Sequence, residues 1–261
     1  MTDQHSPQHW DNAVGQYEAL AAPFTRAFAR VAIEKLALTP TDCLIDIACG
    51  TGAATRVAAE SGARIIAIDF SQGMVDRVVA ARIPNVTAQQ MDGQQLSFPD
   101  ASFDAAVSTF GVMLFPDWQT GFREMARVLR PRGSAAVTTW VEPDGAAVNL
   151  LLADIRKSLF PALPLVPPPG GMGILSDAAR LGAALSAAGF RDVRVEQFNH
   201  DFVLPLDVLD NADQSFSMLP LWTTLTPSQR LQALDEIRRR AGRATSLAIP
   251  SKANVAAGIR V

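Results

Sequence analysis

The sequence predicts an α/β fold in which helices cover a doubly wound, mainly parallel sheet. The first observation is that short apolar segments alternate with amphipathic helical segments between residues 44 and 141. The second is a glycine turn, ACGTG at 48–52, which directly follows the first apolar segment and opens a helix. Parallel strands joined by right-handed helical crossovers satisfy both observations.

The elements of this alternating region follow one another in a regular order. Residues 12–38 carry apolar side chains at helical spacing, so we expect a helix before the first strand. The stretch LIDIACGTGAATRVAAE at 44–60 predicts a strand, a tight turn and a helix. By the same patterns we expect strands at 63–70, 85–92, 102–112 and 134–141. We expect helices at 71–82, with Ser71 as N-cap, and in the stretch 120–133, where the helix ends before Pro131.

The alternation ends after Trp140. The elements expected next are an irregular proline-rich segment at 143–176, a helix at 177–190 closed by Gly189, a strand at 192–202, a helical insertion over roughly 206–242 and a last strand at 251–261. Both irregular segments follow strand ends, so we expect them to form a lid. The expected organisation is a helical gate at 1–38, a core at 39–142, 177–204 and 250–261, and lid insertions at 143–176 and 205–249.

Composition narrows the possible classes of function. Hydrophobic residues make up 48% of the 261 residues, which is enough to bury a sizeable core. A net charge of −3 argues against a general nucleic-acid partner. Neither the cysteines, Cys43 and Cys49, nor the histidines have metal-ligand spacing, so we expect no metal site and a reducing, cytoplasmic location. We also expect no signal segment, and prolines and glycines in 158–176 forbid a membrane-spanning helix.

Acidic residues accompany the first three expected strands. Asp46 lies inside the apolar first strand, where a charge is costly unless something needs it. Asp69 ends the second strand, where a carboxylate can accept both hydroxyls of a ribose. Asp92 ends the third strand and is followed by Gly93; a carboxylate there is placed to accept the exocyclic amine of an adenine. Each acid alone also fits a helix cap or a turn, but the set at neighbouring strand ends predicts a nucleoside-containing ligand.

Two common nucleotide sites fit this pattern poorly. A dinucleotide fingerprint needs a third glycine where Thr55 stands, and Asp46 is foreign to it. The glycine-lysine-serine run of a phosphate loop is missing.

The motif residues resemble a known family. LIDIACGTG resembles the first motif of the class I S-adenosylmethionine-dependent methyltransferases, and AIDFSQGMV resembles their second. MDGQQLSFPDASFDAAVSTFGVMLFPD at 91–117 is similar to the third and fourth motifs, and VLRPRG at 128–133 to the turn before strand five. The match spans roughly 40–141 and is typical of small-molecule, UbiE-like members. Ala48 departs from the pattern, because the family usually has its first glycine there.

The resemblance implies a Rossmann-like sheet of seven strands, the last antiparallel, with helical lid insertions. It also implies S-adenosyl-L-methionine as the cofactor and S-adenosyl-L-homocysteine as its product. The cofactor-binding residues implied by the motifs are Asp46, Ala48, Gly50 and Gly52 around the amino-acid part, Asp69 on the ribose, Phe70 and Met74 beside the adenine, Asp92 and Gly93 at the adenine edge, and Ser108 and Phe110 near the transferred methyl group.

The N-terminal segment HWDNAVGQYEALAAPF resembles the helix that closes over the cofactor in small-molecule members, which makes Trp10 and Tyr17 gate candidates. Simple packing of an amphipathic helix explains them equally well. A general base is optional in this chemistry, and His200 is the candidate catalytic residue, with a surface histidine as the alternative. Further candidates with no additional support are His5, His9, Asp117, Glu142 and Asp144.

The predicted function is SN2-like methyl transfer to oxygen, nitrogen or carbon of a small organic acceptor, achieved mainly by positioning in a closed pocket. Apolar residues of the lid segments indicate an apolar or aromatic substrate, or else form the lid's own core: Leu151, Leu152, Phe160, Phe216, Met218, Leu219 and Trp222. The alternatives are a non-catalytic binder of the same fold, an NAD(P)-dependent oxidoreductase, and an RNA or protein methyltransferase. The sequence leaves the oligomeric state open, a homodimer included.

Overall fold

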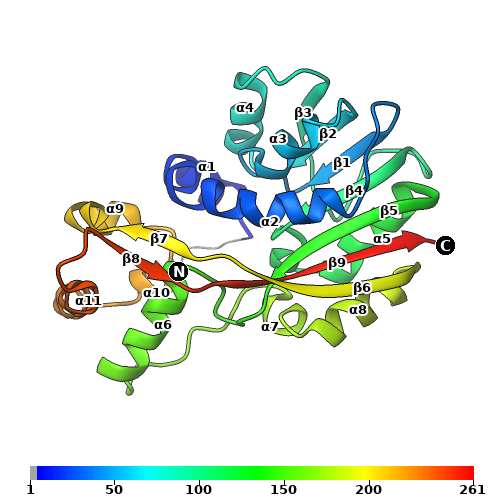
Figure 1. Cartoon of the computed structure of the whole chain (residues 1–261). Helices are drawn as coiled ribbons and strands as arrows, with labels where there is room; N and C mark the ends of the chain where they lie inside the picture. The colour runs from blue at the N-terminus through cyan, green and yellow to red at the C-terminus, as the bar shows by residue number, and fades with distance from the viewer. Residues whose placement is uncertain (1–4) are drawn as a thin grey trace.

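The centre of the fold is a seven-stranded sheet with the strand order β3-β2-β1-β4-β5-β9-β6 (Figure 1). The computed structural model describes residues 5–261. The strands of this sheet are β1 (Cys43–Ile47), β2 (Arg64–Asp69), β3 (Val86–Gln90), β4 (Phe103–Thr109), β5 (Leu129–Trp140), β6 (Phe190–Asn199) and β9 (Lys252–Arg260). Strands β1 to β5 run parallel, and β9 lies antiparallel between β5 and β6. The predicted Rossmann-like sheet with an antiparallel last strand is confirmed.

Burial on both faces explains the apolar sequences of the central strands. All five residues of β1 are buried, and Ile45 lies opposite Ile66 of β2 and Ala106 of β4. Leu44 packs into the hydrophobic cluster on one face of the sheet, whereas Ile45 packs into the cluster on the other. A slip of one residue would exchange these two faces, so the pattern fixes the register.

Helices cover both faces of the sheet. The helices against the sheet are α2 (Ala22–Glu34), α3 (Ala53–Ala59) and α4 (Gln72–Ala80) on one face, and α5 (Trp118–Val128) and α8 (Ala178–Ala187) on the other. Ser71 caps α4 as predicted, because its Oγ accepts the Met74 N–H at 3.2 Å. The helix expected over 12–38 is instead a longer run that starts with α1 (Pro7–Gln16) and contains one π-helical segment, η1 (Tyr17–Ala21).

Beyond the sheet, the segment that follows β6 and the segment that precedes β9 pair with each other as a separate two-stranded ladder. This ladder consists of β7 (Phe202–Pro205) and β8 (Ser246–Ile249), which pair with each other. The strand expected over 192–202 is therefore present as β6 but ends at Asn199, and Phe202 belongs to β7. Pro250 has no N–H to donate, so regular pairing stops at this point, and the buried Ser251 hydroxyl bonds to the Ile249 carbonyl at 3.2 Å. The His200 N–H still donates to the Ser251 carbonyl at 3.0 Å, which joins the two ladders.

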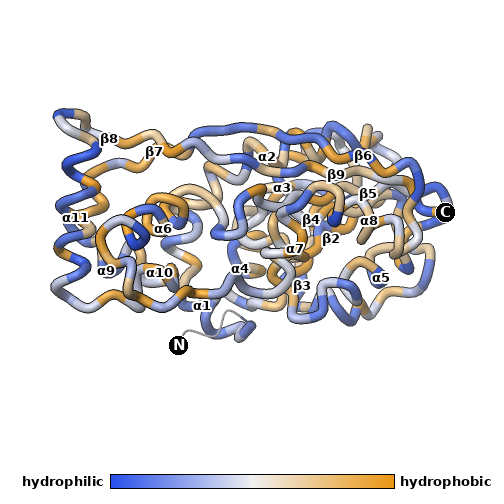
Figure 2. Tube along the Cα trace, turned by 90° about the horizontal axis from the view of Figure 1, so that it is seen from below, coloured by the Kyte–Doolittle hydropathy of each residue, from blue (hydrophilic) through white to orange (hydrophobic). Residues whose placement is uncertain are grey.

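Two insertions meet at the far end of this ladder: the first insertion (143–176) and the second insertion (205–249). Their helices are α6 (Val148–Leu159) and α7 (Met172–Leu175) in the first, and η3 (Leu206–Asn211), α9 (Ala212–Ser215), α10 (Pro220–Thr223) and α11 (Pro227–Ala241) in the second. The buried Arg156 of α6 donates to the Thr224 hydroxyl at 3.0 Å and to the Leu221 carbonyl at 3.3 Å, so it ties the insertions together. Figure 2 shows α11 at the outer edge of the molecule with many hydrophilic residues.

One further boundary differs from expectation. The helix expected to end before Pro131 ends at Val128, and β5 begins directly at Leu129. A short 3-10 helix, η2 (Val112–Leu114), follows β4. Gly133 lies within β5, where an added Cβ would be 2.9 Å from the backbone carbonyl oxygens of Arg130 and Asp104, so this position requires a residue without a side chain. Among the described residues, no helix is both long and apolar enough to cross a membrane.

Candidate active site

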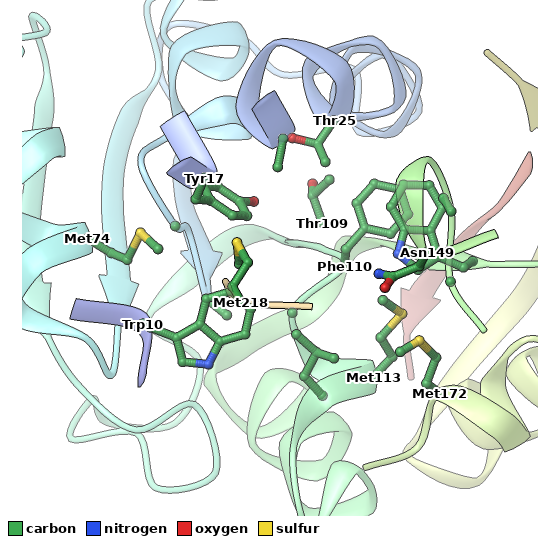
Figure 3. A pocket seen from close by; sticks show the side chains of 18 of the residues that line it. Trp10, Tyr17, Thr25, Met74, Thr109, Phe110, Met113, Asn149, Met172 and Met218 are labelled. Carbon is green, nitrogen blue, oxygen red and sulfur yellow. The ribbon is translucent and has the colours of Figure 1, made fainter. Parts of the chain in front are cut away.

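A cavity of ≈ 330 Å³ lies at the carboxyl ends of β1 to β5, where the N-terminal helices and both insertions meet the sheet (Figure 3). Ligands of open α/β sheets bind at this edge. We call one part of the cavity the acidic half, which is lined by Gly50, Asp69, Phe70, Met74, Asp92 and Gly93. We call the other part the aromatic half, lined by Phe24, Thr109, Phe110, Met113, Trp140, Asn149 and Met172.

The glycine turn forms the floor between β1 and α3. Ala48, Gly50 and Gly52 all have positive φ angles, of 57°, 53° and 87°. Ala48 and Gly50 lie on the cavity wall. A Cβ added to Gly50 would come within 3.3 Å of the Tyr17 ring, so the absence of a side chain lets this ring lie close over the turn.

Asp69 is the most constrained acid of the wall. Its Oδ2 accepts the Gly50 N–H at 2.9 Å, and its Oδ1 accepts the Ser71 N–H at 3.0 Å. Burial raises the pKa of this carboxyl to about 6, against the lowering effect of these two backbone donors. Each oxygen keeps acceptor capacity after these bonds, so the carboxylate can still receive two ligand hydroxyls.

Asp46 lies beneath the glycine turn, outside the cavity wall that the described residues form. Its Oδ2 accepts the Thr55 hydroxyl at 2.6 Å, and its buried Oδ1 has no hydrogen-bond partner. Burial raises the pKa of Asp46 to about 7. The residue thus fixes the turn against α3 and does not face a ligand directly.

The end of β3 supplies the edge of the acidic half. Asp92 is exposed and lines the cavity. Its Oδ1 accepts the Gln94 N–H at 2.8 Å and the Gln94 side-chain amide at 3.1 Å, whereas its Oδ2 has only a long contact to that amide at 3.5 Å. Gly93 is required sterically, because an added Cβ would lie 2.5 Å from the Phe115 ring and 2.9 Å from Ile47. Met74 and Phe70 give this edge an apolar surface.

The N-terminal segment covers the acidic half. Trp10 and Tyr17 both line the cavity and pack edge to face, with ring centroids 6.2 Å apart. Burial raises the pKa of Tyr17 to about 12, so its hydroxyl stays protonated. Asp11 holds α1 in place, because its Oδ1 accepts the Ser71 hydroxyl at 2.6 Å and the Gly73 N–H at 2.9 Å at the start of α4.

Stacked rings dominate the aromatic half. Phe110 and Trp140 lie nearly parallel with ring centroids 3.6 Å apart, and Phe24 stacks on Trp140 at 5.7 Å. Phe110 holds a positive φ of 61°, a strained conformation of the kind found at functional sites. Figure 3 shows Met113 and Met172 below these rings, and Met218 of the second insertion lies between the two halves. This surface suits a planar apolar ligand.

Besides Asp46, three residues with an expected site role lie off the described cavity wall. Ser108 is buried; its hydroxyl donates to the Ile47 carbonyl at 2.9 Å and accepts the Val112 N–H at 3.2 Å, so it braces the turn after β4. Gly52 packs beneath the turn against Val78. His200 is exposed and stacks on Phe24 with centroids 5.9 Å apart. His200 is absent from the described cavity wall but contacts Phe24, which lines it.

The other candidate bases also divide into one residue on the cavity wall and several away from it. His5 lines the cavity, whereas His9, Asp117, Glu142 and Asp144 are absent from its described wall. Asp117 instead caps α5, accepting the Thr120 N–H at 2.9 Å. Of the apolar residues singled out in the insertions, Phe216, Met218 and Leu219 line the cavity; Leu151, Leu152 and Trp222 are buried in the insertion core, and Phe160 packs against it.

Several residues of the cavity wall were not predicted from the sequence. Trp140 could have been found from its place at a strand end, like Asp69. Thr25, Met172 and Asn149 come from helices whose packing onto the sheet no local pattern predicts. Within residues 5–261, no three histidine, cysteine or acidic residues gather as a metal site.

The comparisons with known proteins agree with this geometry. The family model described as "Methyltransferase domain" matches residues 45–137. The chain is 37% identical over 182 residues to demethylmenaquinone methyltransferase of Mycolicibacterium vanbaalenii, covering 65% of this chain and 77% of that protein. It is 30% identical over 254 residues to nocamycin O-methyltransferase of Saccharothrix syringae, covering 88% of each chain. A solved Haemonchus contortus phosphoethanolamine N-methyltransferase 2, in complex with S-adenosylhomocysteine, shares the fold with a TM-score of 0.56 at 14% identity, over 96% of this chain and 57% of that one.

Proposed function

The chain belongs to the class I S-adenosylmethionine-dependent methyltransferases, and on that premise we propose that it methylates an uncharged, apolar and aromatic small molecule. Methyl transfer from S-adenosylmethionine to a small molecule is common to the relatives, and it sets aside the oxidoreductase and non-catalytic alternatives. The observation that carries the finer proposal is that one cavity joins the acidic half to the aromatic half. The acceptors in the relatives' names, demethylmenaquinone and nocamycin, are consistent with an organic acceptor of this kind.

The residues of the acidic half fit the cofactor. The buried Asp69 carboxylate retains acceptor capacity for the two ribose hydroxyls, and Asp92 presents an oxygen for the adenine amine. We propose Phe70 and Met74 as the apolar contacts of the adenine, and the turn at Ala48 and Gly50 as the seat of the amino-acid part. Phe110 borders the position of the methyl group, whereas Asp46, Gly52 and Ser108 support this arrangement from behind.

The protein's part in the reaction is mainly positioning. When bound, S-adenosylmethionine supplies a methyl group already activated on a sulfonium. The stacked Phe110 and Trp140 rings hold the acceptor flat, and the insertions exclude water from it. Orientation of this kind is worth roughly 7–11 kcal/mol of a barrier. With the cofactor bound, the acceptor would supply a lone pair to the methyl carbon, and sulfur would keep the electrons of the broken carbon–sulfur bond. A proton carried by the acceptor would pass to solvent after the transfer.

The three parts of the chain take different roles in this proposal. Within the described chain, residues 5–38 form a gate over the cofactor, the two insertions form a lid over the acceptor, and the sheet with its helices forms the cofactor-binding core. The free, buried thiols of Cys43 and Cys49 support action in a reducing compartment such as the cytoplasm.

Calorimetric titration with S-adenosylhomocysteine tests the proposal first, with NAD in parallel. We expect micromolar binding of S-adenosylhomocysteine and none of NAD. Asp69→Ala should abolish this binding, whereas Asp76→Ala, which changes an exposed acid of α4 outside the cavity, should not. Binding that survives Asp69→Ala would remove Asp69 from the cofactor site.

A further inference from the structure

The aromatic half contains two polar groups that the protein leaves without partners. The Thr109 Oγ1 is buried and has no hydrogen-bond partner. Asn149 makes a backbone hydrogen bond to Ala146, but no described residue bonds its side-chain amide. Figure 3 shows this amide pointing into the cavity from α6, between Phe110 and the methionines. A polar group in an apolar wall costs free energy unless a ligand or water satisfies it.

The Thr109 hydroxyl and the Asn149 amide are neutral, and the other residues of the aromatic half also carry no charge. The described wall contains no lysine, arginine or glutamate, and its two carboxylates, Asp69 and Asp92, belong to the acidic half. A charged acceptor would find no counter-ion in the aromatic half and would lose its hydration there. An amide both donates and accepts, and a hydroxyl does the same, so together they can satisfy a hydroxyl or a carbonyl.

We propose that Asn149 and Thr109 form a neutral polar subsite that binds an uncharged oxygen substituent of a planar aromatic acceptor. The Asn149 amide hydrogen-bonds this oxygen from the first turn of α6, and the Thr109 hydroxyl provides a second contact at the end of β4, next to Phe110. The subsite selects oxygen-bearing neutral rings over bare hydrocarbon rings and over carboxylates. It rests on the proposed function, since it names the acceptor class of the same cavity.

Three bicyclic probes test the subsite by titration against the full chain, with and without saturating S-adenosylhomocysteine. They are 1-naphthol, 1-methylnaphthalene, which lacks the oxygen, and 1-naphthoate, which carries a charge. We expect wild-type protein to bind 1-naphthol tightest. Asn149→Leu and Thr109→Val should each weaken 1-naphthol by about 3- to 10-fold and leave 1-methylnaphthalene within about 2-fold.

The control is Ser215→Ala, which changes another hydroxyl on the cavity wall. The Ser215 hydroxyl already bonds to the Val208 carbonyl at 3.2 Å, so its loss should not alter the ratio of the two affinities. A variant that merely loosens the fold weakens both probes together, and this outcome overturns the proposal, as does tight binding of 1-naphthoate or failure of every probe to bind. Failure of S-adenosylhomocysteine alone to bind refutes the proposed function, whereas the probe ratio without it still decides the subsite.

Discussion

Three non-glycine residues of the described cavity wall, Ala48, Phe110 and Ala147, have positive φ angles, and the packing of the first two explains their conformation. Ala48 and Phe110 have φ angles of 57° and 61°, each a conformation that costs about 1–2 kcal/mol for an L-residue. The two turns to which they belong touch each other. A Cβ on Gly111 would lie only 2.4 Å from the Ala48 Cβ, so the side chain kept at position 48 requires its absence at position 111.

This reciprocity gives a double-mutant prediction. Gly111→Ala should destabilise the protein by about 1–3 kcal/mol through overpacking, and Ala48→Gly in the same chain should restore about 1 kcal/mol. Recovery should be partial, because the new Cβ also meets the Ser108 Oγ at 3.0 Å. Chemical denaturation measures the four free energies of unfolding. Gly15→Ala, which meets no atom within 4 Å, is the control; additive effects of the two substitutions would contradict the argument.

Asp69 predicts how cofactor affinity depends on pH. Its pKa is about 6 in the ligand-free protein, and only the carboxylate can accept a hydrogen bond on both oxygens from ribose hydroxyls. Affinity for S-adenosylhomocysteine should therefore be constant above pH 7 and fall by up to about tenfold per unit below pH 6. Asp69→Asn should bind roughly 10- to 100-fold more weakly and lose this pH dependence. A wild-type affinity that does not change from pH 7 to 5 speaks against the assigned contact.

The candidate bases give a third prediction. In a positioning mechanism neither His5 nor His200 removes a proton from the acceptor, so His5→Asn and His200→Asn should each keep kcat within about 10-fold of wild type. His200 is the internal comparison, because it is absent from the described cavity wall. A loss of 100-fold or more in His5→Asn alone, with a changed pH profile, would establish His5 as a general base.

At the scale of elements, the position of the gate depends on how α1 packs against the start of α4. Asp11 accepts two hydrogen bonds from the start of α4, and Gly73 lets α1 approach so closely that a Cβ there would lie 3.0 Å from Val14. An ion pair between Glu18 and Arg77, at 3.6 Å, adds little because both side chains are about half exposed. Asp11 therefore holds Trp10 and Tyr17 over the cavity.

Removal of this contact should loosen the gate. Asp11→Ala should raise the Kd for S-adenosylhomocysteine by about 3- to 10-fold, and Asp11→Asn by less, since its amide oxygen can still accept both donors. The measurement is calorimetry with the folded variants, together with stopped-flow release of the ligand, which should become faster. Asn12→Ala, an exposed change on the same helix, is the control. Equal losses in Asp11→Ala and Asn12→Ala would mean that the helix acts only through its general stability.

The elements also show where sequence patterns succeed and where they fail. Strands β1, β2, β4 and β5 follow from apolar runs, and α4 follows from Ser71 and helical spacing, because these signals are local. Strand β3, VTAQQ, is only partly buried and carries a weaker signal. The division of 192–202 into β6 and β7 depends on Pro250, which lies some 50 residues away and interrupts the partner strand. Likewise, the acids at strand ends predict one half of the cavity. Asn149 and Thr25 reach the other half through the packing of helices, which no period in the sequence encodes.

At the scale of the whole molecule, two buried acids set the dependence of stability on pH. Asp46 and Asp69 have pKa values raised to about 7 and about 6 from 3.8. An acid whose pKa is higher in the folded state binds its proton more tightly there than in the unfolded chain. Its contribution to stability is therefore fully present below the unfolded pKa, near 4, and is lost as the pH rises through 6 and 7.

The free energy of unfolding should therefore fall between pH 5 and pH 8, by roughly 2 kcal/mol from Asp46 alone. Other carboxyls do not mask this change. Glu60, Asp104, Glu124 and Glu236, among others, have lowered pKa values, so their stabilising contributions are already complete at pH 5. Urea denaturation at several pH values measures the slope, and Asp46→Asn should flatten it while Asp76→Asn leaves it unchanged. A wild-type stability that rises from pH 5 to pH 8 would show that Asp46 is ionised throughout this range. The buried Asp46 Oδ1, which has no partner, would then need a hydrogen-bond donor that the ligand-free fold does not supply.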